Sequence, residues 1–323
     1  MHRKTDTRQH PLVVRLFSLR QVGNEYSSDK INHKVSEEHE LCYLCSMLDE
    51  FIRKSLQEDI GDGDHSTLAC IPADAHGKAN LLVKEKGIIA GIDVAKRIYE
   101  IVDPALELVF YKKDGDAIDV GDIVFQVSGS SQSILTSERL VLNCMQRMSG
   151  IATQTAQVLQ VIKGCSTKIL DTRKTTPGIR FLEKWAVKIG GGENHRFGLY
   201  DMIMLKDNHI DYAGGIKNAI EKTKKYLKDA KRSLKIEIEV RSLEELQEVL
   251  QIGGVDRIML DNFTPERLKE ALKLIPNSFE TEASGGITID NIRPYAETGV
   301  QFISIGALTH SVKGLDLSLK ACF

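Results

Sequence analysis

The second half of the chain repeats one pattern, in which a short apolar stretch is followed by an amphipathic one. The apolar stretches cover residues 168–170, 202–205, 235–240, 257–260, 279–283 and 302–305. Their length and composition predict β-strands, and the segments between most of them have the spacing of amphipathic helices. Alternating strands and helices are typical of a parallel sheet covered by helices, either open or closed into a barrel. We therefore expect an α/β barrel-like domain over residues 164–306.

The first half of the chain has a less regular pattern. Apolar stretches predict strands at residues 78–84, 106–111 and 122–127. Between the first two, apolar side chains recur at helical spacing from Val94 to Val102, and a long helix is predicted over residues 133–163. Together these elements predict an N-terminal α+β domain over residues 47–163 that includes a linking helix. The expected fold class is α/β, with this domain preceding the barrel-like one.

The two ends of the chain differ from the predicted domains. Residues 1–46 are expected to form a flexible N-terminal extension, because the first well-formed amphipathic helix begins at Met47. The first twenty residues are basic, as in an organelle transit peptide, but Ser and Ala are sparse and no secretory signal is present. Residues 307–323 are expected to form a C-terminal segment that packs back on the N-terminal domain.

Charge and cysteine content narrow the class of protein. The chain has 43 Lys and Arg against 45 Asp and Glu, a net charge of −2, which disfavours a protein that coats nucleic acid. A basic run between Lys222 and Arg232 fits a solvated helix face. No apolar run is long enough to span a membrane. Six scattered cysteines fit a reduced, cytoplasmic protein, and Cys42 and Cys45 form a C-x-x-C pair without further metal ligands.

Polar residues follow the predicted strands of the second half in register. Five strands end at Asp171, Lys206, Asp261, Ser284 and Gly306. The sixth strand carries Glu237 and Glu239, which point to the same face because side chains two apart in a strand do so. In barrel enzymes the C-terminal ends of the strands form the active-site face. The sequence therefore predicts one pocket at these strand ends, and spacing alone does not choose between the two glutamates.

The residue types indicate what such a pocket binds. Arg173, Lys174, Arg196 and Lys206 concentrate positive charge, with His195 next to Arg196, which favours a polyanionic substrate. Two carboxylates on neighbouring strands, Glu239 and Asp261, suit Mg²⁺ together with substrate phosphate oxygens. Small residues after two other strands allow backbone N–H groups to approach a phosphate. These small residues are Ser284, Gly285, Gly286, Gly306 and Ala307.

Several motifs resemble those of one family. Residues 172–178 read T-R-K-T-T-P-G, residues 190–199 read G-G-G-E-N-H-R-F-G-L and residues 205–209 read L-K-D-N-H. Further matches are E-D-I-G-D-G-D at residues 58–64 and G-A-L-T-H-S at residues 306–311. Over about residues 47–320 the chain resembles quinolinate phosphoribosyltransferase, the decarboxylating nicotinate-nucleotide pyrophosphorylase of NAD biosynthesis.

The resemblance implies an activity and a set of roles. The reaction would join quinolinate to phosphoribosyl pyrophosphate with Mg²⁺, giving nicotinate mononucleotide, pyrophosphate and CO2, in a homodimer with shared active sites. Lys174, Glu239 and Asp261 would be catalytic, and the last two would also hold the metal. The substrate-binding set would be Arg139 from the neighbouring subunit, Thr172, Arg173, Lys174, His195, Arg196, Lys206, Glu239, Asp261, Ser284, Gly285, Gly286, Gly306 and Ala307.

Two other functions remain open on the sequence. A related phosphoribosyltransferase for nicotinate or another aromatic acid would need fewer cations, because one substrate carboxylate is missing. A non-catalytic sensor of phosphate ligands could use the same fold. In each case the expected partners are small molecules, and no nucleic acid or membrane partner is expected.

Overall fold

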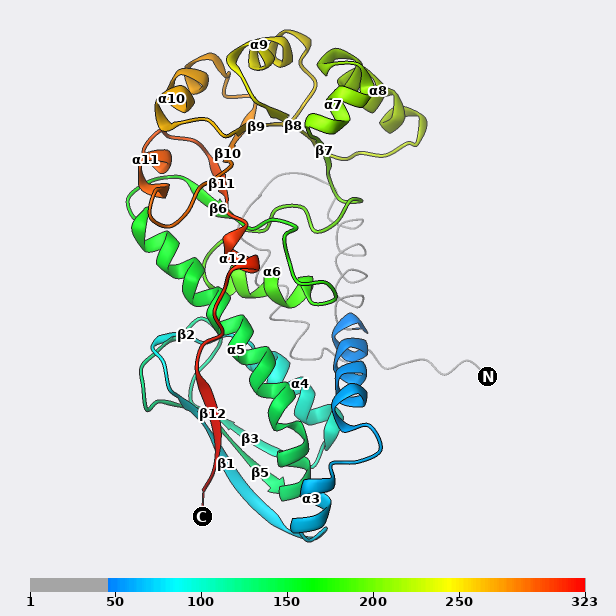
Figure 1. Ribbon diagram of the computed structural model, residues 1–323, viewed down its shortest axis with the longest axis vertical. Helices are drawn as coiled ribbons and strands as arrows, with labels where there is room; N and C mark the ends of the chain where they lie inside the picture. The colour runs from blue at the N-terminus through cyan, green and yellow to red at the C-terminus, as the bar shows by residue number, and fades with distance from the viewer. Residues whose placement is uncertain (1–45, 323) are drawn as a thin grey trace, which may run out of the picture. The chain divides into compact units, whose positions relative to one another are not determined.

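The computed structural model describes residues 46–322, which form two compact units. Of the described residues, unit 1 contains 46–150 and 314–322, and unit 2 contains 151–313 (Figure 1). The predicted extension over residues 1–46 and the Cys42–Cys45 pair lie outside the described residues, apart from Ser46. Within residues 46–322, no helix is both long and apolar enough to cross a membrane.

Unit 1 is built on a four-stranded antiparallel sheet in the order β12-β1-β5-β3. Its strands are β1 (His76–Val83), β3 (Glu107–Phe110), β5 (Ile123–Ser130) and β12 (Leu317–Cys322). The other elements of unit 1 are helical residues 46–60, α3 (His65–Cys70), β2 (Gly87–Ile88), α4 (Ile92–Val102) and β4 (Ala117–Ile118). Alternate residues of β1 are buried, and Tyr99 of α4 meets Phe125 of β5 edge to face, with 6.0 Å between the ring centroids. These contacts form a core between α4 and the sheet.

The boundaries between the units differ from those predicted. Helix α5 (Ser131–Val161) is continuous through Gly150, so the division falls inside the helix and not after residue 163. At the other end, residues 307–313 still belong to unit 2, and the chain joins unit 1 only at Gly314. There β12 pairs antiparallel with β1, with Leu319 opposite Leu81. The C-terminal strand is thus an integral part of the first sheet.

Unit 2 contains a six-stranded parallel sheet in the order β6-β11-β10-β9-β8-β7. The strands are β6 (Lys168–Leu170), β7 (Ile203–Leu205), β8 (Ile236–Val240), β9 (Arg257–Asp261), β10 (Glu280–Ser284) and β11 (Phe302–Ser304). Every neighbouring pair is parallel. All six strands predicted from the apolar stretches are therefore confirmed, and their ends shift by one residue at most.

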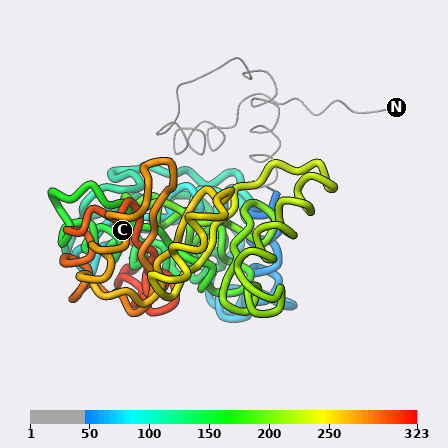
Figure 2. Tube along the Cα trace, turned by 90° about the horizontal axis from the view of Figure 1, so that it is seen from above, coloured from blue at the N-terminus to red at the C-terminus, as the bar shows by residue number. Residues whose placement is uncertain are grey.

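Helices connect these strands in the order expected from the sequence. They are α6 (Arg180–Ile189), α7 (Asp207–Ala213), α8 (Ile216–Asp229), α9 (Leu243–Ile252), α10 (Pro265–Leu274), α11 (Ile292–Ala296) and α12 (Ala307–His310). Ser242 caps α9, and Thr264 caps α10 before Pro265 at its first position. Neighbouring helices α8 and α9 lie side by side, as the green and yellow segments in Figure 2 show. The basic residues of α8 are exposed, as predicted.

The order of the strands makes unit 2 barrel-like. From β7 to β11 each strand lies next to the preceding one, and Figure 1 shows the connecting helices α8–α11 along the outer side of these strands. In the described residues no strand ladder joins β6 to β7. Instead, Glu193 forms a parallel bridge with Leu170, and its N–H donates to the Ile169 carbonyl at 2.8 Å. The segment before β7 therefore covers the exposed edge of β6.

Candidate active site

The C-terminal ends of the strands in unit 2 bring most of the predicted residues to one edge of the sheet. Lys206 directly follows β7, Asp261 ends β9 and Ser284 ends β10, where the last two are paired in register. Gly306 comes two residues after β11. Because parallel strands end at the same edge, these residues surround one region, as predicted.

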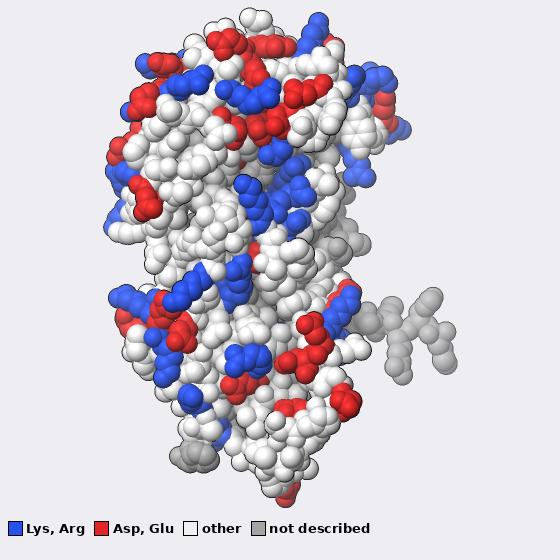
Figure 3. Space-filling model, in the orientation of Figure 1, with Lys and Arg blue, Asp and Glu red and all other residues white. Residues whose placement is uncertain are grey.

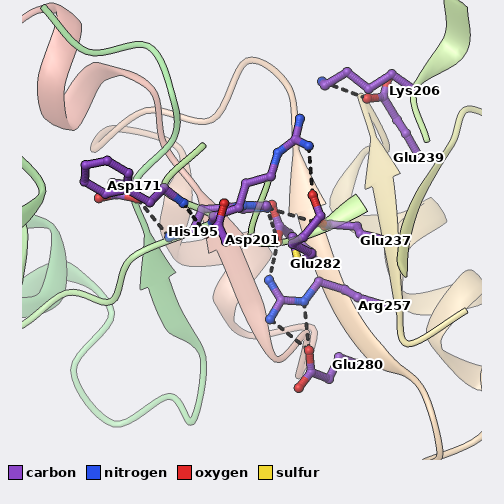
Figure 4. Close-up of polar contacts among 12 residues, drawn as sticks. Asp171, His195, Asp201, Lys206, Glu237, Glu239, Arg257, Glu280 and Glu282 are labelled. Atoms are coloured by element: carbon purple, nitrogen blue, oxygen red, sulfur yellow. Dashed lines mark hydrogen bonds and ion pairs between the residues drawn. The ribbon is translucent and has the colours of Figure 1, made fainter. Parts of the chain in front are cut away.

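Lys206 and Glu239 form the first polar pair of this edge (Figure 4). The Lys206 Nζ lies 3.1 Å from Glu239 Oε2. The Lys206 side chain is 46% exposed and that of Glu239 only 9% exposed, so the lysine covers the carboxylate. Glu237, two residues earlier in β8, is fully buried and faces other partners. The structure thus separates the two glutamates that sequence spacing left equivalent, and places Glu239 at the strand-end edge.

Arg173 and Arg196 form a pair of like charges. Burial and the charge of Arg173 lower the pKa of the Arg196 guanidinium, although Glu237 and Asp201 act in the opposite direction. The Nε of Arg173 is buried and has no hydrogen-bond partner among the described residues. Arg196 donates from Nη1 to the Met202 carbonyl at 3.1 Å, which fixes its direction. An anion between the two guanidinium groups would satisfy the buried donor and screen the repulsion.

Lys174 is held by its main chain and leaves its ammonium group exposed. Its N–H donates to Thr172 Oγ1 at 3.0 Å, and its carbonyl accepts a bond from Thr309 Oγ1 at 2.8 Å. The Lys174 side chain also lies against Gly306, where an added Cβ would come 2.9 Å from Lys174 Cδ. A side chain at position 306 would therefore require the flexible Lys174 side chain to shift.

A tight backbone corner follows Asp261. Gly285 has φ +92°, and a Cβ there would lie 2.3 Å from Asn262 Oδ1 and 2.8 Å from the Asn262 nitrogen. Asn262 itself has φ 57°, and its N–H donates to the Ser284 carbonyl at 2.9 Å. Only glycine fits at position 285. The corner places the Ser284–Gly286 backbone beside Asp261.

A buried ion pair supports the loop that carries His195 and Arg196. The ammonium group of Lys184 on α6 forms an ion pair with Asp171 Oδ1. The Lys184 side chain is 2% exposed and that of Asp171 is 0% exposed. Lys184 Nζ also donates to the His195 carbonyl at 3.1 Å, and the His195 N–H donates to Asp171 Oδ1 at 2.8 Å. Burial raises the pKa of Asp171 to about 6. Sequence reasoning gave Lys184 no role, although it lies three residues after buried Phe181 and three before buried Val187.

The His195 ring is buried and occupied by protein groups. Its Nε2 lies 3.0 Å from Glu237 Oε2 and 3.4 Å from Glu282 Oε2, in bent ion-pair contacts. Its Nδ1 accepts the Arg196 N–H at 2.7 Å. The ring was expected to bind a substrate carboxylate, but neither ring nitrogen is directed to solvent in this structure. Sequence reasoning missed Glu282 because its partner lies far away along the chain.

These charges shift the titration of the cluster. Although burial lowers the pKa of His195, its two carboxylate neighbours raise it to about 9. The Arg196 amide favours the neutral ring and so opposes this rise in pKa, because its N–H can donate only to an unprotonated Nδ1. Burial and the Glu282 charge raise the pKa of Glu237 to about 7. The proton on Nε2 is favoured in either state of the ring, so the carboxylates face an N–H.

The predicted metal residues have suitable chemistry for Mg²⁺. Glu239 and Asp261 lie on adjacent strands, and Val240 pairs with Leu260 between them. Mg²⁺ commonly takes one or two protein carboxylates and completes its shell with phosphate oxygens and water, so this donor set fits the ion. The residues that come close enough to form a three-ligand cluster within the described chain are different ones: His195, Glu237 and Glu282.

The charge distribution agrees with an anion-binding role. Figure 3 shows Lys and Arg side chains gathered near the middle of the face in view, within the part formed by unit 2. Arg139, the residue predicted to come from a neighbouring subunit, lies exposed on α5 in unit 1. It is the one predicted site residue that unit 2 does not contain. All the others lie at or directly below the strand-end edge of unit 2.

Fold and site together define a class of protein, a two-domain α/β enzyme with a cationic anion-binding edge on a parallel sheet. Family models of the quinolinate phosphoribosyl transferase N-terminal and C-terminal domains match residues 64–149 and 151–320. The chain therefore belongs to the quinolinate phosphoribosyltransferase family and is a phosphoribosyltransferase.

Individual relatives agree with this assignment. The chain is 47% identical over 284 residues to the chloroplastic nicotinate-nucleotide pyrophosphorylase [carboxylating] of Oryza sativa subsp. japonica, covering 83% of this chain and 76% of the relative. It is 44% identical over 262 residues to the probable nicotinate-nucleotide pyrophosphorylase [carboxylating] of Bacillus subtilis (strain 168). That match covers 81% of this chain and 89% of the relative. The crystal structure of NadC from Streptococcus pyogenes superposes with a TM-score of 0.81 at 39% identity. The superposition covers 85% of this chain and 97% of the NadC chain.

Proposed function

We propose that this chain transfers the phosphoribosyl group of phosphoribosyl pyrophosphate to quinolinate, with loss of CO2, to give nicotinate mononucleotide and pyrophosphate. The observation that carries the proposal is the Arg173–Arg196 pair, with a buried Nε that lacks an acceptor among the described residues. A doubly charged pyridine acid would supply the missing acceptor oxygens. The names of the rice and Bacillus relatives support the same reaction.

Quinolinate would bind at the cationic side of the edge. Arg173 and Arg196 would take one carboxylate through paired N–H donors, the geometry that guanidinium groups favour. Lys206, which pairs with Glu239 in this structure, would take the second carboxylate as a point charge. His195 would help to position Arg196 for its carboxylate contact, because its Nδ1 accepts the Arg196 main-chain N–H.

Phosphoribosyl pyrophosphate would bind along the remaining strand ends. Lys174 would contact its pyrophosphate, and Thr172 would hold the turn that presents this lysine. Glu239 and Asp261 would bind the ribose hydroxyls and Mg²⁺. The ion, when bound, would supply positive charge to the departing pyrophosphate. The 5′-phosphate would lie against the small residues Ser284, Gly285, Gly286, Gly306 and Ala307.

The chemistry requires orientation more than a reactive side chain. Displacement at the anomeric carbon passes through an oxocarbenium-like state, so the site must hold two anions in line and stabilise the leaving group. Such orientation supplies about 7–11 kcal/mol in favourable cases. Once the pyridine nitrogen carries the ribose, its positive charge stabilises the electron pair that stays on ring carbon C2 when the 2-carboxylate departs as CO2, and C2 then takes a proton from water to give nicotinate mononucleotide. The chain needs no nucleophile for either step.

We also propose a homodimer in which Arg139 completes the site of the neighbouring subunit. Its exposed position on α5, in a different unit from the other site residues, supports this proposal. A cytoplasmic location remains a prediction from cysteine content, and the rice relative is named as a chloroplastic protein.

A substrate comparison tests the proposed reaction. Purified protein with Mg²⁺ and phosphoribosyl pyrophosphate is expected to release CO2 from carboxyl-labelled quinolinate and to consume nicotinate far more slowly. A preference for nicotinate would favour the related phosphoribosyltransferase. Binding of the substrates without turnover of any pyridine acid would favour the sensor.

A further inference from the structure

The inner face of the sheet in unit 2 carries a buried charged layer below the site. In β8 the residues alternate, with Ile236, Ile238 and Val240 on one face and Glu237 and Glu239 on the other. All five are buried. Glutamate inside a strand is expensive to bury without partners, so the partners of Glu237 determine what this layer does.

The next two strands complete this layer. In the strand register, Arg257 of β9 pairs with Glu237 on one side and with Glu280 of β10 on the other. Its guanidinium lies 2.8 Å from Glu280 and 3.1 Å from Glu282, and stacks on Phe302 at 4.2 Å from the ring centroid. These contacts fix Glu282, which is fully buried. Figure 4 shows Arg257 between the two β10 glutamates, with Glu282 next to His195.

Four polar groups of His195 each lie next to another protein group, and three of them form hydrogen bonds. The main-chain N–H and carbonyl are held by Asp171 and Lys184. The ring Nε2 faces Glu237 and Glu282, and Nδ1 accepts the Arg196 N–H. The ring therefore lies between the buried carboxylates and the main chain of Arg196, so the carboxylates help to fix where that main chain lies. The Arg196 side chain faces Arg173.

We propose that Glu237 and Glu282 are positioning residues that orient Arg196 through the His195 ring. This inference rests on the proposed function, because it assigns Arg196 to the carboxylates of a pyridine acid. Replacing a buried charged cluster by apolar residues is often neutral or stabilising, so holding Arg196 in one direction explains why these charges are present. The contact needs an N–H on Nε2 and a lone pair on Nδ1.

The same three side chains also have the composition of a metal site. A metal ion on Nε2 would require the ring hydrogen on Nδ1, where it would meet the Arg196 N–H. Arg257 already occupies one side of Glu282 at 3.1 Å. The geometry therefore favours a brace over a bound ion, where the brace is the His195 ring held by its charge contacts with Glu237 at 3.0 Å and Glu282 at 3.4 Å.

Two variants of one residue test the brace. In Glu237→Leu we expect KM for quinolinate to rise about tenfold, while KM for phosphoribosyl pyrophosphate and kcat change about twofold or less. Glu237→Gln keeps an acceptor for the Nε2 hydrogen and should restore most of the quinolinate affinity. Glu280→Gln is the matched control, because Glu280 contacts Lys235 and Arg257 but not His195. Equal losses for both substrates, or no rescue by Glu237→Gln, would overturn the proposal.

A second measurement does not depend on the reaction. Histidine-labelled full-length protein is expected to show, by ¹H–¹⁵N NMR at a pH above the His195 pKa of about 9, a neutral ring protonated on Nε2 and unprotonated on Nδ1, assigned by its loss in His195→Gln. In Glu237→Leu this tautomer preference should disappear. If wild-type protein lacks turnover but shows this tautomer, the proposed function fails and the brace stands. Stoichiometric metal in the purified protein that is lost in Glu237→Gln would instead establish a metal site.

Discussion

Lys184 and Asp171 form an ion pair that is almost completely buried in unit 2, and both also bind the main chain of His195. The pair joins helix α6 to the end of β6 directly below the site. Its removal should therefore affect stability and the site together.

Replacement of Lys184 tests the structural role of this pair. Lys184→Met leaves a buried carboxylate without its counter-ion, so we expect a loss of about 3–5 kcal/mol in the free energy of unfolding, measured by urea denaturation. Lys273→Met, an exposed lysine in the last turn of α10, is the control and should change stability by about 0.5 kcal/mol or less. Similar losses in the two variants would show that the Asp171 contact contributes little.

Lys206 tests how the site distinguishes its two anionic substrates. Lys206→Ala removes a charge assigned to quinolinate, and loss of a charge-assisted bond of about 1.5–3 kcal/mol predicts a rise of about tenfold or more in the quinolinate KM. The KM of phosphoribosyl pyrophosphate should change much less. Steady-state kinetics with each substrate varied in turn would measure both, and equal effects would contradict the assignment.

The strand-end edge could be predicted because it depends on local periodicity. An apolar stretch that ends in a polar residue marks a strand end, and parallel strands bring those ends together. Periodicity thus predicts that Lys206 and Asp261 lie at one edge, whereas it leaves Glu237 and Glu239 equivalent and only the family resemblance favours Glu239. The positions of Lys206 and Asp261 required no knowledge of which strands are neighbours.

The buried layer and the sheet of unit 1 could not be predicted in this way. Glu282 was included in an apolar stretch, and its partner Arg257 becomes a neighbour only through the register of β9 and β10. Likewise, β12 reaches β1 from the other end of the chain. Both depend on pairings between distant segments, which the period of a single strand does not encode.

The corner at Gly285 should tolerate no side chain. In Gly285→Ala, the new Cβ would overlap Asn262 and the positive φ would be strained, so both stability and turnover should fall. Gly286→Ala is the matched control, since its φ of +62° carries about 1–2 kcal/mol of strain but no atom lies within 4 Å. Thermal unfolding and turnover of the two variants would separate overlap from strain. Equal losses would mean that the Asn262 contact is unimportant.

Acid stability should report on Glu280. Although burial raises its pKa, the contacts with Lys235 and Arg257 lower the pKa of Glu280 below its usual value of 4.5. The unfolded chain then binds the proton more tightly, so this stabilisation is present above pH 4.5 and is lost as pH falls through the folded-state pKa. Unfolding titrations of wild type and Glu280→Gln should converge on acidification. A constant difference between them over that range would argue against the ion pairs.

Subunit mixing tests whether Arg139 completes a neighbouring site. An Arg139→Ala chain and an Arg173→Ala chain should each be nearly inactive alone. Half of the randomly mixed dimers are hybrids, and each hybrid has one intact site of two, so activity should recover to about a quarter of the wild-type value. Mixing Arg173→Ala with Lys206→Ala is the control, because both residues belong to unit 2 of their own chain and no intact site can form. Recovery in the control, or none with Arg139→Ala, would refute the shared site.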